Sequence, residues 1–385
     1  MKIVLAFLLL TISLPLIAHA NDRSSLPKHL KIAIILRSSE TAPYISSQYL
    51  NYYKQGLDTA SYFAKTKGTA ITYRFYIIRD ISQLSQQMDE IKNWHPSFII
   101  GPNYSNYFLL LKNYFSNILV LSANANDQRI ALLPTNFYTL TPLNDEYALA
   151  VSNYIVEKFP SANIYTIVDR NCKACFDMAD SFSRIFQSAC PHKKIFTTYV
   201  FNSDFKETSV ENLIPGYSKK DVVLMLATTN SSITLMLQIA NYSNYPVTFI
   251  GDDTWGAAPD SQLGKLNSKN LYTAIHIIPW SLQLNTKQFA LFKNNYETTF
   301  HMPPVDNITY TVFSTVNSVL YAVANCYGNK DNDIQERILS CYRQQLKNNA
   351  HAFRPELFTV EKVGASSNTL IGTVPSNKKY YCHRT

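Results

Sequence analysis

Short apolar runs rich in β-branched residues alternate with amphipathic helical patterns along most of the chain. Residues 30–36 ("LKIAIIL") and 97–100 ("SFII") are apolar at almost every position, and helical patterns such as residues 47–68 separate these runs. Strands without a polar face belong to sheets covered on both sides, and their alternation with helices is typical of parallel sheets. The sequence therefore predicts an α/β protein built on doubly wound parallel sheets.

The same pattern starts again in the second half of the chain. A strand is predicted at residues 163–168 and a helix at 174–189, and the apolar runs 357–363 and 369–374 predict a terminal hairpin. A chain of 385 residues is long enough for two lobes of ordinary domain size. We therefore expect two doubly wound lobes.

The first twenty residues predict a secretory signal peptide. Lys2 supplies a positive start, residues 3–17 supply an apolar run, and residues 18–20 ("AHA") form a small-residue cleavage site. Pro15 interrupts the run, which is shorter than the roughly 20 apolar residues of a membrane-spanning helix. We expect cleavage near Ala20–Asn21 and an exported, soluble mature chain.

The charge of the chain is moderately basic, with a formal net charge of +8, 46% hydrophobic residues and 16% charged residues. Lys and Arg are scattered, and no basic stripe with interleaved aromatic residues occurs. We interpret this distribution as a solvated surface and expect no nucleic-acid partner.

Six cysteines in an exported chain indicate up to three disulfides, for which 15 connectivities exist. The six candidates are Cys172, Cys175, Cys190, Cys326, Cys341 and Cys382. Cys326 and Cys341 belong to consecutive helical patterns and are expected to join them. Cys190 ends the helix that Cys172 and Cys175 precede, so we expect a local pair there, with Cys382 taking the remaining partner. The full connectivity stays open.

The end of the strand at residues 97–100 is a candidate binding site. Gly101-Pro102 stops the apolar run, and Asn103, Tyr104 and Ser105 follow at once. Ligands of open α/β sheets bind beyond the carboxyl ends of the strands. Ser105 is predicted to begin a helix, where unpaired N–H groups favour an anion. The alternative is an ordinary turn between a strand and a helix.

Several motifs occur in an order and spacing that resemble the type I periplasmic solute-binding proteins, which serve ABC transporters for branched-chain amino acids and related solutes. The motifs are "ETAPY" (40–44), "KQGLDTA" (54–60), "IIGPNYS" (99–105), "LVLSANAND" (119–127), "FYTLTPLNDEYALAV" (137–151), "FIGDDTWG" (249–256) and "FKNNYETTFHMPP" (292–304). The resemblance covers most of the mature chain.

The resemblance implies a non-enzymatic periplasmic receptor that closes on a small solute and passes it to the membrane permease of an ABC importer. In the family, a serine and backbone groups bind the carboxylate of an amino acid, which points to Ser105, Ala125 and Asn126 here. An acidic residue binds the ammonium group, which points to Asp253. Tyr44 is expected to cap the pocket, and Tyr104 to form part of its wall.

The resemblance also implies two discontinuous lobes joined by three crossover strands, near residues 141–146, 266–275 and 348–358. We expect a signal peptide at residues 1–20, lobe 1 at residues 21–143 and 272–352, and lobe 2 at residues 144–271 and 353–385. We expect a monomer without cofactor or metal. The ligand is expected to be an amino acid or a related carboxylate or amide.

The sequence departs from the family pattern in two places. Residues 170–177 ("RNCKACFD") stand where the family has a tyrosine-glycine pair, and residues 313–315 ("FST") stand where it has Tyr-Asp-Ala. Both departures bear on the pocket, so a ligand other than a branched-chain amino acid is compatible with the resemblance.

Three alternatives remain open from the sequence. Cys172 and Cys175 form a C-x-x-C motif after a strand and before a helix, the arrangement that activates thiols in thiol–disulfide oxidoreductases. The same cysteines, with Cys190 and His192, offer four ligands that zinc accepts, although an oxidising compartment favours disulfides. A receptor or regulatory protein without a transport role is the third alternative, because a fold does not fix a function.

Overall fold

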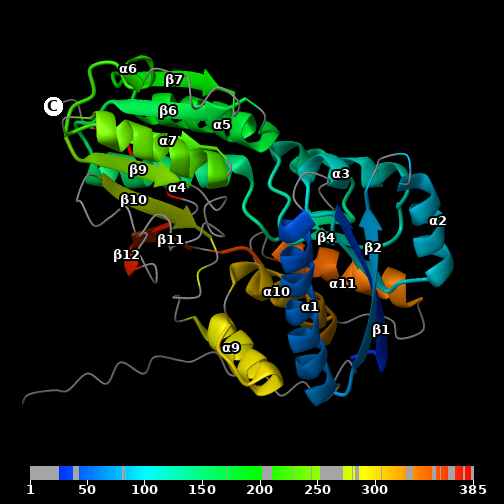
Figure 1. Ribbon diagram of the computed structural model, residues 1–385. Coiled ribbons are helices and arrows are strands. Elements are labelled where there is room, and N and C mark those ends of the chain that lie inside the picture. The colour runs from blue at the N-terminus through cyan, green and yellow to red at the C-terminus, as the bar shows by residue number, and fades with distance from the viewer. Residues whose placement is uncertain are drawn as a thin grey trace, which may run out of the picture.

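The computed structural model describes two sheets with their covering helices (Figure 1). The described residues are 26–37, 43–79, 82, 84–170, 172–201, 210–227, 229–243, 245–251, 272–279, 281, 286–304, 306–326, 333–348, 353–355, 357–362, 369–375 and 378–382, without the side chains of 43–46 and 229–234. The predicted signal peptide lies outside these residues. No helix in the described part of the chain has the length and apolar character needed to cross a membrane.

The first sheet has five parallel strands in the order β2-β1-β3-β4-β5. Its strands are β1 (His29–Arg37), β2 (Ala70–Ile78), β3 (Phe98–Ile100), β4 (Val120–Ser122) and β5 (Phe137–Thr139). Alternate residues of β1 enter different cores: Ile32 and Ile34 face one side and Ala33 and Ile35 the other, and all four are 0% exposed. Burial on both faces explains why these strands have no polar alternation.

Helices cover both faces of this sheet. One face carries α1 (Pro43–Thr66), α9 (Lys287–Phe300), α10 (Asn307–Ala324) and α11 (Ile334–Asn348), and the other carries α2 (Leu84–Trp94), α3 (Ser105–Leu110) and the short 3-10 helices η2 (Leu111–Asn113) and η3 (Gln128–Leu132). The helix predicted from residue 105 is shorter than its apolar pattern, because α3 passes into η2 after Leu110. The sheet and these helices are lobe 1.

The second sheet has seven strands in the order β12-β11-β10-β9-β8-β6-β7. Its strands are β6 (Ile164–Asp169), β7 (Ile195–Val200), β8 (Val222–Leu226), β9 (Val247–Gly251), β10 (Tyr272–Ile278), β11 (Leu357–Lys362) and β12 (Thr369–Pro375). The first five run parallel, and β11 and β12 form the predicted antiparallel hairpin at one edge.

Helices of the second sheet also lie on both faces. One core contains residues of α4 (Asn144–Lys158) and α5 (Lys173–Ala189), and the other contains residues of α6 (Val210–Leu213) and α7 (Thr229–Tyr242). This sheet and these helices are lobe 2, the upper left part of Figure 1. The two doubly wound lobes predicted from the sequence are confirmed.

Strand β10 belongs to lobe 2, since it pairs with β9 on one side and β11 on the other. The resemblance assigns residues 272–352 to lobe 1 and places a crossover near residues 266–275, so this boundary and the end of this crossover need correction. The chain leaves lobe 2 only after Ile278, because the β-branched run at 272–278 completes the buried centre of the second sheet before α9 begins in lobe 1.

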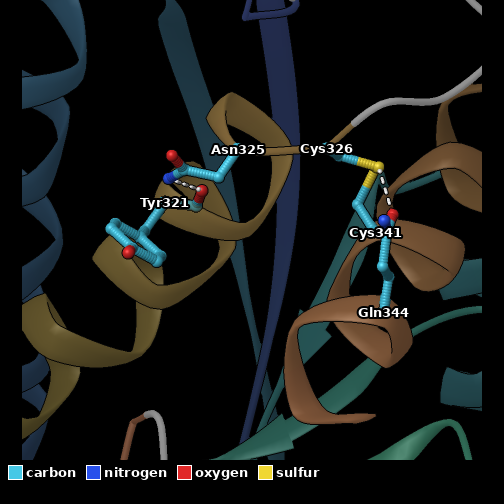
Figure 2. Close-up of a disulfide and its surroundings, with 5 residues drawn as sticks. All are labelled: Tyr321, Asn325, Cys326, Cys341 and Gln344. Atoms are coloured by element: carbon cyan, nitrogen blue, oxygen red, sulfur yellow. Dashed lines mark hydrogen bonds between the residues drawn. A yellow bond between two sulfur atoms is a disulfide. The ribbon is translucent and has the colours of Figure 1, made fainter. Parts of the chain in front are cut away.

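All six cysteines form disulfides, and the predicted Cys326–Cys341 bond is confirmed. Cys326 follows the last turn of α10 and Cys341 lies in α11, so the bond fixes these two neighbouring helices of lobe 1 to each other (Figure 2). Close by, the side-chain amide of Asn325 donates to the backbone oxygen of Tyr321 at 2.8 Å and satisfies a carbonyl at the end of α10.

The local pair expected for Cys190 is wrong. Cys172 bonds to Cys175, and Cys190 bonds to Cys382 near the end of the chain. The reason is the length of α5: its 17 residues separate its two ends by about 25 Å, whereas bonded cysteines need Cα atoms within about 7 Å. A cysteine at the end of this helix must therefore find a partner from another part of the chain.

Candidate functional site

A cavity of about 600 Å³ lies between the lobes, at the carboxyl ends of strands from both sheets. Lobe 1 lines it with Arg37, Tyr49, Asn103, Tyr104, Ser105, Asn106, Asn124, Asn126, Asp127, Arg129, Thr141, Asp306, Asn307, Ile308 and Thr311, and lobe 2 with Asn144, Cys172, Lys173, Ala174, Asp177, Ile278 and Pro279. This interlobe cavity occupies the place where open α/β sheets bind ligands.

The turn after β3 shapes the lobe 1 wall. Gly101 has a φ of 100°, and the Gly101–Pro102 peptide bond is cis. A Cβ atom at position 101 would lie 1.9 Å from the backbone oxygen of Ile35, so only glycine fits where the chain passes β1. The backbone N–H of Arg37 donates to Oδ1 of Asn103 at 3.0 Å, which joins the ends of β1 and β3.

Ser105 begins α3, and its hydroxyl connects two loops of the wall. Its Oγ accepts hydrogen bonds from the backbone N–H groups of Asn126 at 3.1 Å and Asp127 at 3.3 Å. A hydroxyl that accepts two hydrogen bonds still has its own proton to donate. The Ser105 hydroxyl can therefore donate to an anionic group in the cavity, while the N–H of Asn126 is already used.

Ala125 lies beneath the wall and does not line the cavity. It is fully buried, and its N–H donates to Oγ of Ser122 at 2.9 Å. Of the three residues that the sequence directs toward a ligand carboxylate, the structure thus brings Ser105 and the Asn126 side chain to the cavity. Neither backbone N–H at 125 or 126 is free in this geometry.

Two other residues predicted from the sequence lie outside the described side chains. Asp253 falls in the range 252–271, which the structure does not describe. Tyr44 falls in the first turn of α1, of which only the backbone is described. Their expected roles stay predictions.

Tyr104 lines the cavity and is 43% exposed. The guanidinium carbon of Arg37 lies 5.5 Å from the centre of the Tyr104 ring and 4.6 Å from that of Tyr107. Sequence reasoning missed Arg37, although a charged residue directly after the buried run 30–36 was a usable signal.

Asp306 is a second lining residue that sequence reasoning missed. It is the N-cap of α10, and its Oδ1 accepts a hydrogen bond from the N–H of Ile308 at 2.6 Å. Burial raises the pKa of Asp306 to about 6, although this hydrogen bond acts in the opposite direction. Burial is also the main cause that raises the pKa of Tyr49, to which the nearby charge of Asp306 contributes.

Charged pairs from the two lobes face each other across the cavity. In lobe 1, Arg129 donates to both carboxylate oxygens of Asp127, and in lobe 2 Lys173 pairs with Asp177 one helical turn away. Burial opposes the ionisation of Asp127, but Arg129 and, more weakly, Lys173 outweigh it and lower the pKa of this carboxyl group. Opposite charges on facing lobes favour their approach.

Cys172 and Cys175 lie at the start of α5, and Cys172 lines the cavity. Their disulfide closes the first turn of the helix, where the N–H of Cys175 also points to Sγ of Cys172 at 3.1 Å. Because all six cysteines are bonded, no thiolate is left here for a zinc ion.

Comparison of the sequence with protein-family models and with curated proteins finds no match. Comparison of the structures does find similar proteins. The branched-chain amino acid transporter substrate-binding protein LivJ of Streptococcus pneumoniae, in complex with isoleucine, has a TM-score of 0.67 and 12% identity over 90% of this chain and 99% of that chain.

A solute-binding protein of an ABC transporter from R. palustris, in complex with benzoate, has a TM-score of 0.68 and 13% identity over 92% of this chain and 99% of that chain. The leucine-binding protein LivK of Thermotoga maritima has a TM-score of 0.67 and 10% identity over 90% of this chain and 99% of that chain. All three are named as binding proteins for solutes or substrates. The chain therefore has the type I periplasmic binding protein fold that its motifs indicate.

Proposed function

We propose that this protein, which has the fold of the type I periplasmic solute-binding proteins, is an exported receptor that captures a small polar solute between its lobes. The solute is an amino acid or a related carboxylate or amide, and the protein delivers it to the permease of an ABC importer. It acts without enzymatic chemistry of its own.

The observation that carries this proposal is the interlobe cavity. Its volume of about 600 Å³ lies within the range of small-molecule sites, roughly 300–1,000 Å³. Its walls present hydroxyl, amide and charged side chains from both lobes, the groups that fix the orientation of a polar solute. The ligands bound in two of the similar structures, isoleucine and benzoate, are small molecules that carry a carboxylate.

The proposal includes a location and a mode of action. The predicted signal peptide directs the chain to the periplasm, with cleavage near Ala20–Asn21, and the mature protein acts as a monomer. The lobes close as a hinge about the chain crossings between β5 and α4, between β10 and α9, and after α11. Closure about the cavity makes ligand release, and hence transfer to a permease, dependent on the hinge.

A thermal-shift screen tests the proposal. Amino acids, small carboxylates and amides are added to the purified mature protein, because a ligand stabilises the state that binds it. We expect at least one solute to raise the melting temperature, with calorimetry confirming one site per chain. A melting temperature that no small polar solute moves would exclude this function. Co-purification with a permease, rather than with a sensor kinase or a synthase, separates transport from a receptor role on the same fold.

A second candidate function, thiol–disulfide exchange, is favoured by one observation: the Cys172–Cys175 disulfide lies at the N-terminus of α5 and at the edge of the cavity. An insulin reduction assay tests it, with the Cys172→Ser/Cys175→Ser protein as control. Turnover that depends on these two cysteines would support this candidate, and its absence leaves the disulfide a structural role.

A further inference from the structure

The charged residues that line the interlobe cavity divide into two pairs and two single residues. Asp127 bonds to Arg129 and Lys173 bonds to Asp177, each pair within one lobe. Arg37 and Asp306 also line the cavity, and neither forms an ion pair with any residue that the structure describes. The described lining residues thus present one uncompensated cation and one uncompensated anion.

Arg37 is held in place by contacts that leave its charge available. Its backbone is fixed by the hydrogen bond to Asn103, and its guanidinium group lies against the rings of Tyr104 and Tyr107. Its Nε is buried and has no hydrogen-bond partner among the residues that the structure describes. A buried N–H group without an acceptor is unfavourable, and the planar guanidinium group matches a carboxylate in charge and geometry.

Asp306 is a lining carboxylate whose negative charge has no cationic partner among the described residues. Its Oδ1 caps α10 through Ile308, but no cationic group of the described chain balances its charge. The raised pKa of Asp306 reflects this burial without compensation. A ligand ammonium group beside the carboxylate would provide the missing charge.

Two tyrosines connect these residues along the lobe 1 wall. Tyr104 lies beside Arg37, and Tyr49, Tyr104 and Asp306 all line the cavity from lobe 1. The two single charges therefore belong to one continuous surface of lobe 1. Since the three cationic and three anionic side chains that line the whole cavity balance in number, the cavity is complementary to a solute that is neutral overall but carries both charges.

Resting on the proposed function, we propose that Arg37 and Asp306 bind the two opposite charges of a zwitterionic solute, so that lobe 1 alone recognises both its carboxylate and its ammonium group. The hydroxyl of Ser105 adds a hydrogen bond to the carboxylate side. Lobe 2 then closes over a ligand that is already oriented, and carboxylates or amines that have only one charge bind more weakly.

The experiment compares matched probes on the full mature protein. The twenty L-amino acids and 4-aminobutyrate are screened beside primary amines and carboxylates of the same carbon skeletons, each with one charge removed, and beside benzoate. We expect the largest stabilisation from a zwitterion and at least 30-fold weaker binding of both single-charge analogues in calorimetry.

Two variants assign the charges to residues. Asp306→Asn removes the charge but keeps a good N-cap for α10, and Arg37→Gln removes the cation. Each is expected to weaken binding of the best zwitterion by at least 30-fold. Asp306→Asn should leave binding of the matched carboxylate almost unchanged, and Arg37→Gln should leave binding of the matched amine almost unchanged. Misfolding cannot produce this crossed pattern.

Matched controls lie away from the cavity on the same lobe. Arg74→Gln removes a guanidinium group that lies over a ring, that of Trp94, and Asp89→Asn removes an exposed carboxylate of α2. Both should bind like the wild type. Arg37→Lys should recover part of the lost affinity, because it restores the charge without the planar group.

The outcomes separate this inference from the proposed function. If benzoate or another single-charge solute binds best, or if both variants keep the affinity within 3-fold, the inference is overturned and the proposed function stands. If no solute of any set binds, both are overturned.

Discussion

The two walls of the interlobe cavity are built in different ways. The lobe 1 wall is built around the segments that follow β1, β3 and β4, which are hydrogen-bonded to one another through Asn103 and Ser105, and the start of α10 completes it. The lobe 2 wall consists mainly of the first turn of α5, closed by the Cys172–Cys175 disulfide, and carries the charge of Lys173 on a side chain that is 72% exposed.

This difference indicates that the two lobes have different roles in ligand binding. A wall whose polar groups are held before the ligand arrives loses little conformational entropy on binding. An exposed lysine is mobile and screened by solvent, so it attracts the facing lobe without fixing a ligand. We expect lobe 1 to determine which solute binds, and lobe 2 to determine how readily the cavity closes.

The largest expected effect on stability comes from the Cys190–Cys382 disulfide, which stabilises lobe 2 away from the cavity. Replacing Cys190 and Cys382 with Ser opens a link of 192 residues, and loop entropy predicts a loss of about 3–5 kcal/mol in the free energy of unfolding. Replacing Cys172 and Cys175, only three residues apart, should cost no more than about 2 kcal/mol. Urea unfolding measures both, and the reverse order would mean that the cavity end stabilises lobe 2.

The next effect concerns the lobe 1 wall. Gly101→Ala places a Cβ against the oxygen of Ile35 and should lower the free energy of unfolding by about 3 kcal/mol or more, with loss of ligand binding. Gly68→Ala is the matched control. Gly68 has a φ of 83°, but a Cβ there meets nothing within 4 Å, so only about 1 kcal/mol is expected. Equal effects on thermal unfolding would contradict a wall fixed at Gly101.

The third effect is a pH dependence from Asp306. Because its pKa in the folded protein is raised to about 6, its stabilising contribution is complete below its unfolded pKa, near 3.8. This contribution is lost as the pH rises through about 6. Without ligand, the stability of the wild type relative to Asp306→Asn should fall by about 1–2 kcal/mol between roughly pH 4 and pH 7. Parallel stability profiles for the two proteins would show that burial does not perturb this carboxyl group.

The smallest effect belongs to lobe 2. Lys173→Gln removes an exposed charge that faces Asp127, and the expected change in stability is at most about 0.5 kcal/mol. Ligand affinity should change by less than about 3-fold and mainly at low salt. Calorimetry at two ionic strengths measures this, and a loss of 10-fold or more at high salt would assign solute recognition to lobe 2 as well.

Sequence reasoning recovered the fold because its signals are local. The almost entirely apolar runs at β1, β3 and β8 record burial on both faces, and most predicted elements agree with the structure to within a few residues. The sequence pattern of β10 does not reveal to which lobe this strand belongs. Its pattern is that of any buried strand, and only pairing with β9 and β11 assigns it to lobe 2.

The candidate site was recovered only in part. Ser105, Tyr104 and Asn126 line the cavity because they follow strand ends, which a sequence reveals. Arg37 and Asp306 were missed, since each has an ordinary local explanation as the last residue of a strand or as a helix cap. What distinguishes them is the lack of a partner, which depends on residues distant in the chain.

The sequence by itself determined the alternating elements, the two sheets and the polar turns at their strand ends, because hydrophobic periodicity and turn chemistry act between near neighbours. The tertiary structure decided which cysteines form disulfides with each other and which backbone N–H groups are used within the protein. It also decided which charged side chains of the cavity have no ion-pair partner among the described residues. These properties depend on distances between segments that are far apart in sequence. The roughly 22 Å along α5 that separate Cys175 from Cys190 are one such distance.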